Sequence, residues 1–311
     1  MDPRKCPVCS SSDSTLLMQF TPEQLCLNNP SYDLDILREA IKGQEQYLSY
    51  SKCNRCSMVF CEKYWDDENL NIVYSDIIMH EKSKEKIFSI DKRRMLLNTW
   101  TNILRLLKFQ GKIKLDSIKL VDFGCGWGDF LEVVNGSGVE AMGFDQDQQK
   151  VNYAKARRHR IAHTPEKLIE FGPVDIFVMN SVIEHIQDVG EIFNLVNSVL
   201  TPGGIFVCSV MDYRERFLRK SAKRLKRGLP ALTKNLNPVE HVNIYNYDSV
   251  LATLEKYGFH FLATRHVLYV TDTYGLKNNM KVIHWFNLIE KWLLKLFSGR
   301  EFGIQVYALK H

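Results

Sequence analysis

Three glycines flanked by acidic residues are the strongest chemical signal in this chain of 311 residues. Gly124, Gly126 and Gly128 interrupt an apolar run that begins at Lys119, and a helical pattern resumes at Asp129. Glycine has no Cβ, so the backbone can pass close to a ligand. A strand, a glycine turn and a helix in this order hold nucleotide-like ligands at the edge of a parallel sheet. The turn is therefore predicted to bind a nucleotide-like ligand.

The spacing of the glycines separates two kinds of nucleotide-like ligand. A dinucleotide fingerprint reads G-x-G-x-x-G, and it would need glycine at position 129, where this chain has aspartate. The observed G-x-G-x-G, preceded by Asp122, resembles motif I of the class I S-adenosylmethionine (SAM) methyltransferases. Asp145 ends the next predicted strand, where a carboxylate can accept hydrogen bonds from ribose hydroxyls. The resemblance implies that SAM is the cofactor and that Asp122, the three glycines and Asp145 bind it.

Other polar residues are expected near this turn because of where the strands end. Gln146 opens the helix after Asp145, and Asn180 ends a buried strand further along the chain. In open parallel sheets, ligands lie at the carboxyl ends of the strands. Gln146 and Asn180 are therefore further candidates for contact with the cofactor. Glu184 and His185 follow Asn180 and are placed near the same site.

Two histidines, His185 and His241, each follow a glutamate and are candidates for a general base. A histidine with a near-neutral pKa can take the proton of an attacking hydroxyl. The block Glu240-His241-x-x-x-Tyr resembles the E-H-x-x-x-[FY] segment of sugar methyltransferases that carry a zinc ribbon. The resemblance implies that His241, oriented by Glu240, is the first candidate and that His185, with Glu184, is the second. The alternative is that each histidine only lines the site or hydrogen-bonds its loop.

Four cysteines in two C-x-x-C pairs have the spacing of metal ligands. Cys6 and Cys9 form the first pair, and Cys53 and Cys56 form the second. Four thiolates can close a tetrahedral zinc site, which leaves no position open for water and is therefore structural. An insertion with a helix at residues 32–42 is expected between the pairs, and strands are expected on both sides of the second pair. The alternative is two thiol-rich turns without metal.

The elements that must position these residues alternate along the chain. The predicted strands span residues 119–123, 139–145, 160–164, 173–180, 204–210, 258–270 and 303–310. The predicted helices span residues 75–109, 129–134, 146–158, 191–200, 248–257 and 281–296. Alternating strands and helices build a parallel sheet with helices on both faces. Together with the resemblance, they predict an α/β fold: a Rossmann-like seven-stranded sheet, its last strand antiparallel, with a small N-terminal zinc-binding module.

These elements also predict the domain organisation. A zinc-ribbon-like module occupies residues 1–75, a linking helix residues 76–112 and a SAM-dependent methyltransferase domain residues 113–311. Within that domain, residues 212–237 form an insertion in which basic residues outnumber acidic ones and alternate with apolar residues. This lid could bind phosphates of the acceptor, touch an anionic membrane surface or bind RNA. A solvated amphipathic helix is the alternative.

Composition and charge narrow the class of protein. A hydrophobic content of 45% is ordinary for a globular domain, and the net charge of +5 is mild. The sequence shows no apolar leader and no apolar run of membrane-spanning length, so a cytoplasmic protein is expected. The basic insertion and an apolar, tryptophan-containing helix at residues 281–296 leave peripheral contact with the inner membrane face as a second expectation.

The resemblance implies in-line transfer of a methyl group from SAM, assisted by a histidine base and a structural zinc. A sugar, a glycan or a related small molecule, with or without phosphate, is the expected acceptor. The chain shows no counterpart of the long C-terminal domain of the sugar C-methyltransferases, so O-methylation is expected. One alternative is an RNA methyltransferase, which the acidic residues between the cysteine pairs disfavour. The other is a non-catalytic scaffold in which zinc docks a partner.

Overall fold

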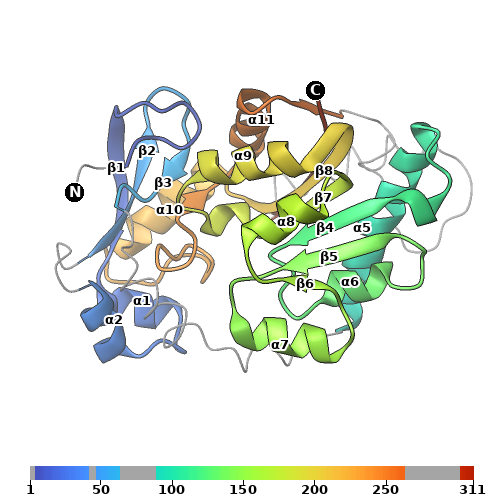
Figure 1. Cartoon of the computed structure of the whole chain (residues 1–311). Helices are drawn as coiled ribbons and strands as arrows, with labels where there is room; N and C mark the ends of the chain where they lie inside the picture. Colours follow the sequence, from blue (N-terminus) through green and yellow to red (C-terminus); the bar gives the residue numbers. More distant parts are fainter. Residues whose placement is uncertain (1–3, 42–46, 64–88, 263–301) are drawn as a thin grey trace, which may run out of the picture.

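The computed structural model describes residues 4–41, 47–63, 89–262 and 302–311. These residues form two sheets, one of seven strands and one of four. The four-stranded sheet lies to one side of the larger sheet and its helices (Figure 1).

The larger sheet has the strand order β10-β11-β8-β7-β4-β5-β6. Its strands are β4 (Lys119–Phe123), β5 (Glu140–Phe144), β6 (Ile161–Ala162), β7 (Val174–Asn180), β8 (Leu200–Asp212), β10 (Phe259–Phe261) and β11 (Phe302–Lys310). The pairs among β4 to β8 are parallel, and β11 lies antiparallel between β8 and β10. The predicted Rossmann-like sheet of seven strands with an antiparallel last strand is confirmed.

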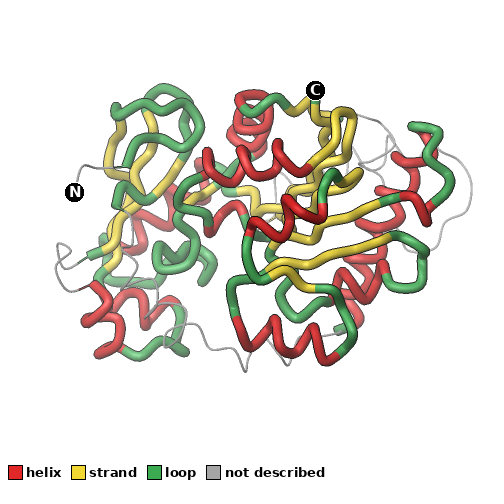
Figure 2. The backbone as a smooth tube through the Cα atoms, in the orientation of Figure 1, coloured by secondary structure: helices red, strands yellow, loops and turns green. Residues whose placement is uncertain are grey.

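Helices cover both faces of this sheet (Figures 1 and 2). They are α5 (Ile90–Phe109), α6 (Asp129–Val134), α7 (Gln148–Ala156), α8 (Pro165–Phe171), α9 (Val189–Val199) and α11 (Tyr247–Lys256), with short 3-10 turns η2 (Leu115–Ser117) and η3 (Ile183–His185). The apolar residues of β7 pack on both faces of the sheet, because successive side chains of a strand point to opposite sides. Ile176 and Val178 join the core that contains Trp100 of α5, whereas Phe177 joins the core that contains Phe193 of α9.

The smaller sheet contains three strands from the part of the chain that carries the two cysteine pairs, residues 4–63, and one strand from much later in the chain. Its order is β1-β2-β3-β9, and every pair is antiparallel. The strands are β1 (Ser14–Phe20), β2 (Leu48–Cys53), β3 (Val59–Phe60) and β9 (Asn243–Ile244). The predicted strands on both sides of the second cysteine pair are present as β2 and β3. The predicted insertion helix appears as α2 (Leu34–Ile41), preceded by α1 (Pro22–Asn28), which the sequence did not indicate.

The basic insertion packs on this small sheet through its apolar residues. Its helix α10 (Glu215–Leu225) buries Leu218, Ala222 and Leu225 in a core shared with Phe20 of β1. The apolar side of this helix is therefore covered by protein, and contact of the basic insertion with an anionic membrane surface stays a prediction. The basic side chains of α10 that remain exposed are Arg216, Arg219, Lys220 and Lys223. None of the helices in the described part of the chain has the length and apolar character needed to cross a bilayer.

Several predicted elements fall partly or wholly outside the described residues. The helix of the linking segment, α5, begins at Ile90 after the N-cap Ser89, and the residues predicted before it lie outside the described part of the chain. The predicted strand at 258–270 is described only as β10. The predicted helix at 281–296 and the predicted domain boundary at residue 75 lie outside the described residues.

Candidate active site

The glycine turn lies at the carboxyl end of β4, beside the carboxyl end of β5. All three glycines have positive φ angles, +73° at Gly124, +56° at Gly126 and +85° at Gly128, which other residues adopt only with strain. The amides of Gly124 and Cys125 donate to the carbonyl of Phe144 at 2.7 and 2.9 Å, so β5 holds the turn in place. Cys125 is buried within the turn, so we expect its side chain only to fill space there.

Asp145 closes the turn with its carboxylate. One oxygen accepts from the amide of Gly126 at 2.8 Å, and the other accepts from the amide of Asp147 at 2.9 Å. Asp147 in turn caps the N-terminus of α7. A Cβ built on Gly126 would meet no protein atom within 4 Å, whereas a Cβ on Gly124 would collide with the side chain of Val182. The turn therefore presents open backbone at Gly126, as a close-lying cofactor requires.

Asp122 is a buried carboxylic acid directly before the turn. Only 3% of its surface is exposed, and one carboxylate oxygen has no hydrogen-bond partner. Burial, followed by the nearby Asp145 carboxylate, raises the pKa of Asp122 from 3.8 to about 7, against the opposing effect of Lys92. An orphaned carboxylate of this kind could pair with a cationic group of SAM, whose methionine part carries an ammonium group and is joined to the adenosyl part through a sulfonium.

Replacing Asp122 with asparagine is expected to stabilise the protein without cofactor above neutral pH. The raised pKa means that the folded protein holds a proton that the unfolded chain releases between pH 3.8 and about 7, so stability falls as pH rises through this range. Asp122→Asn removes that loss, with an expected gain on the order of 4 kcal/mol at pH 8 and almost none at pH 4. Thermal unfolding at both pH values measures it, with the exposed Asp116→Asn as the control. An equal effect at both pH values would contradict the assignment.

The two remaining candidates for cofactor contact have different surroundings. Gln146 is exposed beside the turn. Asn180 lies at the carboxyl end of β7, where its side-chain oxygen accepts from the hydroxyl of Ser209 at 3.2 Å. The amide nitrogen of Asn180 is buried and has no partner among the described residues. Asn180 therefore offers a free donor near the turn, and Gln146 offers a flexible side chain.

The two candidate histidines lie against each other. Their ring centroids are 4.6 Å apart with an interplanar angle of 69°. Nδ1 of His185 lies 2.9 Å from the carbonyl of Glu240, and Nδ1 of His241 lies 2.6 Å from the carbonyl of Asn235. A carbonyl only accepts, so Nδ1 carries the proton in both neutral rings and Nε2 is left with its lone pair. Each Nε2 can therefore accept a proton or bind a cation.

The predicted orientation of His241 by the Glu240 carboxylate is wrong. Glu240 accepts from the hydroxyl of Tyr32 and, at 3.1 Å, from the side-chain amide of Asn237. The carbonyl of Asn235 fixes His241 instead. Tyr32 lies in the insertion between the cysteine pairs, so no local pattern in the sequence could have indicated this partner.

Glu184 completes a buried cluster with the two histidines. One ligand atom from each of Glu184, His185 and His241 lies within 4.8 Å of the others. Glu184 is 6% exposed, one of its oxygens has no partner, and burial raises its pKa to about 8. Burial, and then the neighbouring His241, lowers the pKa of His185 to about 3. Glu184 and His241 also line a small pocket with Met211 and Tyr213. The cluster can take up a proton or hold a divalent cation.

The histidine cluster is close to the glycine turn through η3. Val182, which directly precedes η3, lies against Gly124, and η3 itself contains Glu184 and His185. Val182 therefore brings the start of the segment after β7 to the glycine turn, and contact of Glu184 or His185 with the cofactor stays a prediction.

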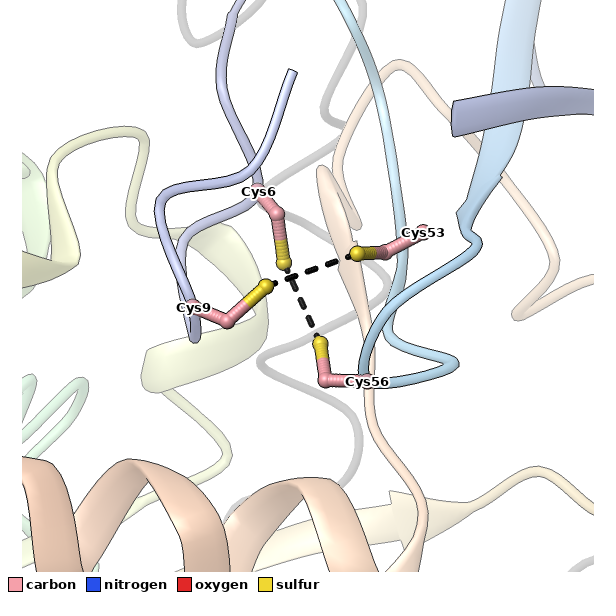
Figure 3. Close-up of side chains that lie close together, drawn as sticks. All are labelled: Cys6, Cys9, Cys53 and Cys56. Atoms are coloured by element: carbon pink, nitrogen blue, oxygen red, sulfur yellow. Dashed lines mark hydrogen bonds between the residues drawn. The ribbon is translucent and has the colours of Figure 1, made fainter. Parts of the chain in front are cut away.

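The four paired cysteines converge from two turns, as Figure 3 shows. The sulfurs of Cys6 and Cys56 are 3.4 Å apart, and those of Cys9 and Cys53 are 3.5 Å apart. All four sulfurs lie within 4.8 Å of one another, and none forms a disulfide. Zinc with sulfur ligands at about 2.3 Å places tetrahedral sulfurs about 3.8 Å apart. The cluster therefore has the ligand type and nearly the dimensions of a four-thiolate zinc site.

Comparison with known proteins gives one family match. The model of the "Methyltransferase domain" family matches residues 93–264. The ubiquinone biosynthesis O-methyltransferase of Bradyrhizobium sp. (strain ORS 278) is 27% identical over 193 residues, which cover 56% of this chain and 76% of that protein. The corresponding protein of Pelagibacter ubique is 24% identical over 177 residues, which cover 52% of this chain and 74% of that protein. Some matches are shorter, such as that of Caulobacter sp. (strain K31), of which 44% is covered.

Solved structures with a related arrangement include a SAM-dependent methyltransferase from Archaeoglobus fulgidus. That protein is 17% identical, with a TM-score of 0.44 and coverage of 75% of this chain and 100% of the other. The plantazolicin methyltransferase BamL, in complex with a triazolic desmethylPZN analog and SAH (S-adenosylhomocysteine), is 14% identical, with a TM-score of 0.48 and coverage of 78% of this chain and 94% of the other.

Proposed function

The chain belongs to the methyltransferase-domain family, as a class I SAM-dependent methyltransferase, and from this premise we propose that it methylates a hydroxyl of a small-molecule acceptor. SAM, when bound, supplies an electrophilic methyl group. The chain's own residues supply the cradle for the cofactor at Asp122, the glycine turn and Asp145. Next to that cradle, His241 supplies a proton acceptor. Curated relatives named as O-methyltransferases support oxygen as the accepting atom.

Burial carries the choice between the two rings, because it lowers the pKa of His185, and the hydrogen bond of Nδ1 of His241 to the carbonyl of Asn235 supports His241 as the base. This bond leaves the lone pair of Nε2 free to take the proton of the acceptor as the new bond forms. His185 is the weaker base, because burial beside His241 holds its pKa at about 3. Gln146 and Asn180 are proposed to contact the cofactor from the ends of neighbouring elements.

A methyl-transfer assay with labelled SAM tests this function. The acceptors to be offered are a catechol, a nucleotide sugar, a simple glycoside and a short RNA, and the label is followed into each product. Transfer to a hydroxyl of one of the first three supports the proposal. Transfer only to RNA, with activity that falls steeply with salt, would replace the proposal by an RNA methyltransferase. Failure to bind SAM and SAH in calorimetry would favour a scaffold.

The same assay with a chelator distinguishes two uses of the Glu184–His185–His241 cluster. A general base needs no metal, so activity is expected to survive EDTA as long as the zinc content of the cysteine cluster is unchanged. Loss of activity at unchanged zinc content that is restored by Mg²⁺ would mean that the cluster ionises the acceptor through a bound metal. In that case His241 would be a ligand and not the base.

The exposed basic face of α10 supports an acceptor that carries phosphate. Arg216, Lys220 and Lys223 are exposed on this helix, and lysine and arginine side chains form strong charge-assisted hydrogen bonds with phosphate oxygens. A nucleotide sugar or a phosphate-bearing glycan would therefore be preferred over its free sugar. Comparing phosphorylated and unphosphorylated acceptors tests the preference.

The four-cysteine cluster is proposed to hold one structural zinc ion. Purified protein is expected to contain about one zinc per chain by elemental analysis, because four thiolates fill the coordination sphere of zinc. Cys9→Ser should lose most of the metal and lower the thermal stability, since metal binding adds to the free energy of folding. Cys26→Ser is the matched control, because Cys26 lies outside the cluster. Equal zinc contents in the two variants would exclude the site.

A further inference from the structure

The cysteine region is joined to the His241 segment by strand pairing. We use the term cysteine hairpin for β2, the turn of Cys53 and Cys56, and β3. The arm β3 pairs with β9, which begins two residues after His241, and the amide of Cys61 donates to the carbonyl of Val242 at 2.9 Å. The backbone that carries the histidine is therefore an extension of the cysteine hairpin's sheet.

A buried tyrosine of the cysteine hairpin contacts His241 itself. Tyr50 of β2 has no exposed surface, and its hydroxyl donates to the backbone carbonyl of His241 at 2.6 Å. A buried hydroxyl and a buried carbonyl are each costly to leave unpaired. This bond therefore fixes the position of the peptide group from which the histidine ring extends.

Arg4, two residues before Cys6, connects the same region to both histidine segments. Its guanidinium donates to the carbonyls of Val242 at 3.3 Å and Gln187 at 2.6 Å, and more weakly to that of Cys61 at 3.4 Å. Gln187 lies two residues after His185, so one side chain spans the segments of the two histidines. Arg4 is only 5% exposed, and a charge buried on backbone carbonyls is retained only where the geometry is well defined.

Asn243 ties the two segments to each other. Its side-chain amide donates to the carbonyls of Ile183 at 3.1 Å and Ile186 at 2.7 Å, on either side of His185. Asn243 belongs to β9, which pairs with the cysteine hairpin. A displacement of the hairpin would consequently move both histidines.

We propose that the N-terminal cysteine region is a positioning element of the catalytic centre, in which Arg4 and Tyr50 hold the backbone of His185 and His241 at their working separation. Arg4 and Tyr50 are positioning residues, because the hydrogen bonds described above go to backbone carbonyls of the histidine segments and not to the imidazole rings. The inference rests on the proposed roles of the histidines for its functional meaning. The coupling itself is a property of the fold and can be measured without a methyl acceptor.

Deuterium exchange of the full chain tests the coupling. Arg4→Met keeps much of the apolar stem and removes the donors, and exchange in segments 183–187 and 237–245 is expected to rise about tenfold. SAH affinity by calorimetry is expected to stay within about twofold, because the glycine turn is held by β5 and not by the cysteine region. Lys5→Met, an exposed neighbour, is the matched control and should match wild type.

Two further variants separate positioning from loss of folding. Tyr50→Phe keeps the ring in the core and should raise exchange only in segment 237–245, which makes the test possible even if Arg4→Met does not fold. Arg4→Lys keeps one charged donor and should give an intermediate exchange. Wild-type exchange in both segments, or a rise spread evenly over the whole chain, would overturn the proposal. Increased exchange together with unchanged turnover of His241→Ala would leave the coupling intact and reject only the proposed base.

Discussion

Replacing His241 with alanine is expected to lower the rate of methyl transfer at least about a hundredfold, the usual size of a general-base contribution. The hydroxyl of the acceptor attacks poorly while it keeps its proton, and Nε2 of His241 is the nitrogen left free to remove it. SAH affinity should remain within about twofold, because the glycine turn is held by Asp145 and by the carbonyl of Phe144 and not by the His241 ring. Turnover on the acceptor found by the labelled-SAM assay, together with calorimetry on SAH, measures both quantities.

The pH profile and two controls make this prediction specific. The pH dependence of turnover should lose the limb that reports protonation of the base, since alanine cannot be protonated. His260→Ala, an exposed histidine on β10, should leave turnover unchanged. Glu240→Gln should have a much smaller effect than His241→Ala, because its carboxylate faces Tyr32 and Asn237. Unchanged turnover in His241→Ala would remove this residue from the role.

His185 illustrates why the nearness of two histidines does not make them equivalent. Both rings donate through Nδ1 to a carbonyl, so the hydrogen bonds alone would allow either to act. His185 is the ring held neutral by burial and by His241, with its pKa at about 3. A histidine with this pKa is a poor proton acceptor at neutral pH, so we expect His185 to line the site and not to act as the base.

The parts of the site that lie on one βα unit were predictable from sequence. The turn from β4 to α6 needs positive φ at three positions, so its glycines identify it directly. The predicted helix over 129–134 and the carboxylate at Asp145 are found where the pattern placed them. Such features depend on the conformation of a few consecutive residues, so the types of those residues are enough to predict them.

The parts that depend on contacts between distant segments were not predictable. No sequence pattern indicates that the Glu240 carboxylate accepts from the hydroxyl of Tyr32, because Tyr32 lies far away along the chain, in the insertion between the cysteine pairs. The two residues of β9 are too few to form a recognisable strand pattern, and yet they join the cysteine region to the His241 segment. Side-chain periodicity predicts which face of an element is buried, but it does not predict which other part of the protein covers that face.

The basic insertion shows the same limit on a larger scale. The alternation of charged and apolar residues in α10 predicts an amphipathic helix. The pattern is equally compatible with a bilayer, an acceptor or a protein core on the apolar side. The buried Leu218, Ala222 and Leu225 resolve this choice, because they pack into the core of the small sheet and leave only the basic side for a partner.

Replacing Gly126 with alanine is expected to weaken SAM and SAH binding about ten- to hundredfold. A Cβ at this position meets no protein atom within 4 Å, so the space it would fill is the space proposed for the cofactor. Forcing a methyl group into a close-packed contact costs about 1–3 kcal/mol, and about 1.4 kcal/mol is a tenfold change in affinity. Calorimetric titration of wild type and Gly126→Ala with SAH measures the loss.

Gly136→Ala is the matched control for the backbone strain of this change. Gly136 has a φ of +79° and also has no protein atom within 4 Å of its Cβ position, but it lies in the exposed turn after α6. Both variants should lose about 1–2 kcal/mol of stability from the left-handed conformation, and only Gly126→Ala should lose affinity. Equal SAH affinities in the two variants would mean that the glycine turn is a strand–helix corner that does not touch the cofactor. The proposed binding mode would then have to be abandoned, whereas the sheet and the cysteine region would stand unchanged.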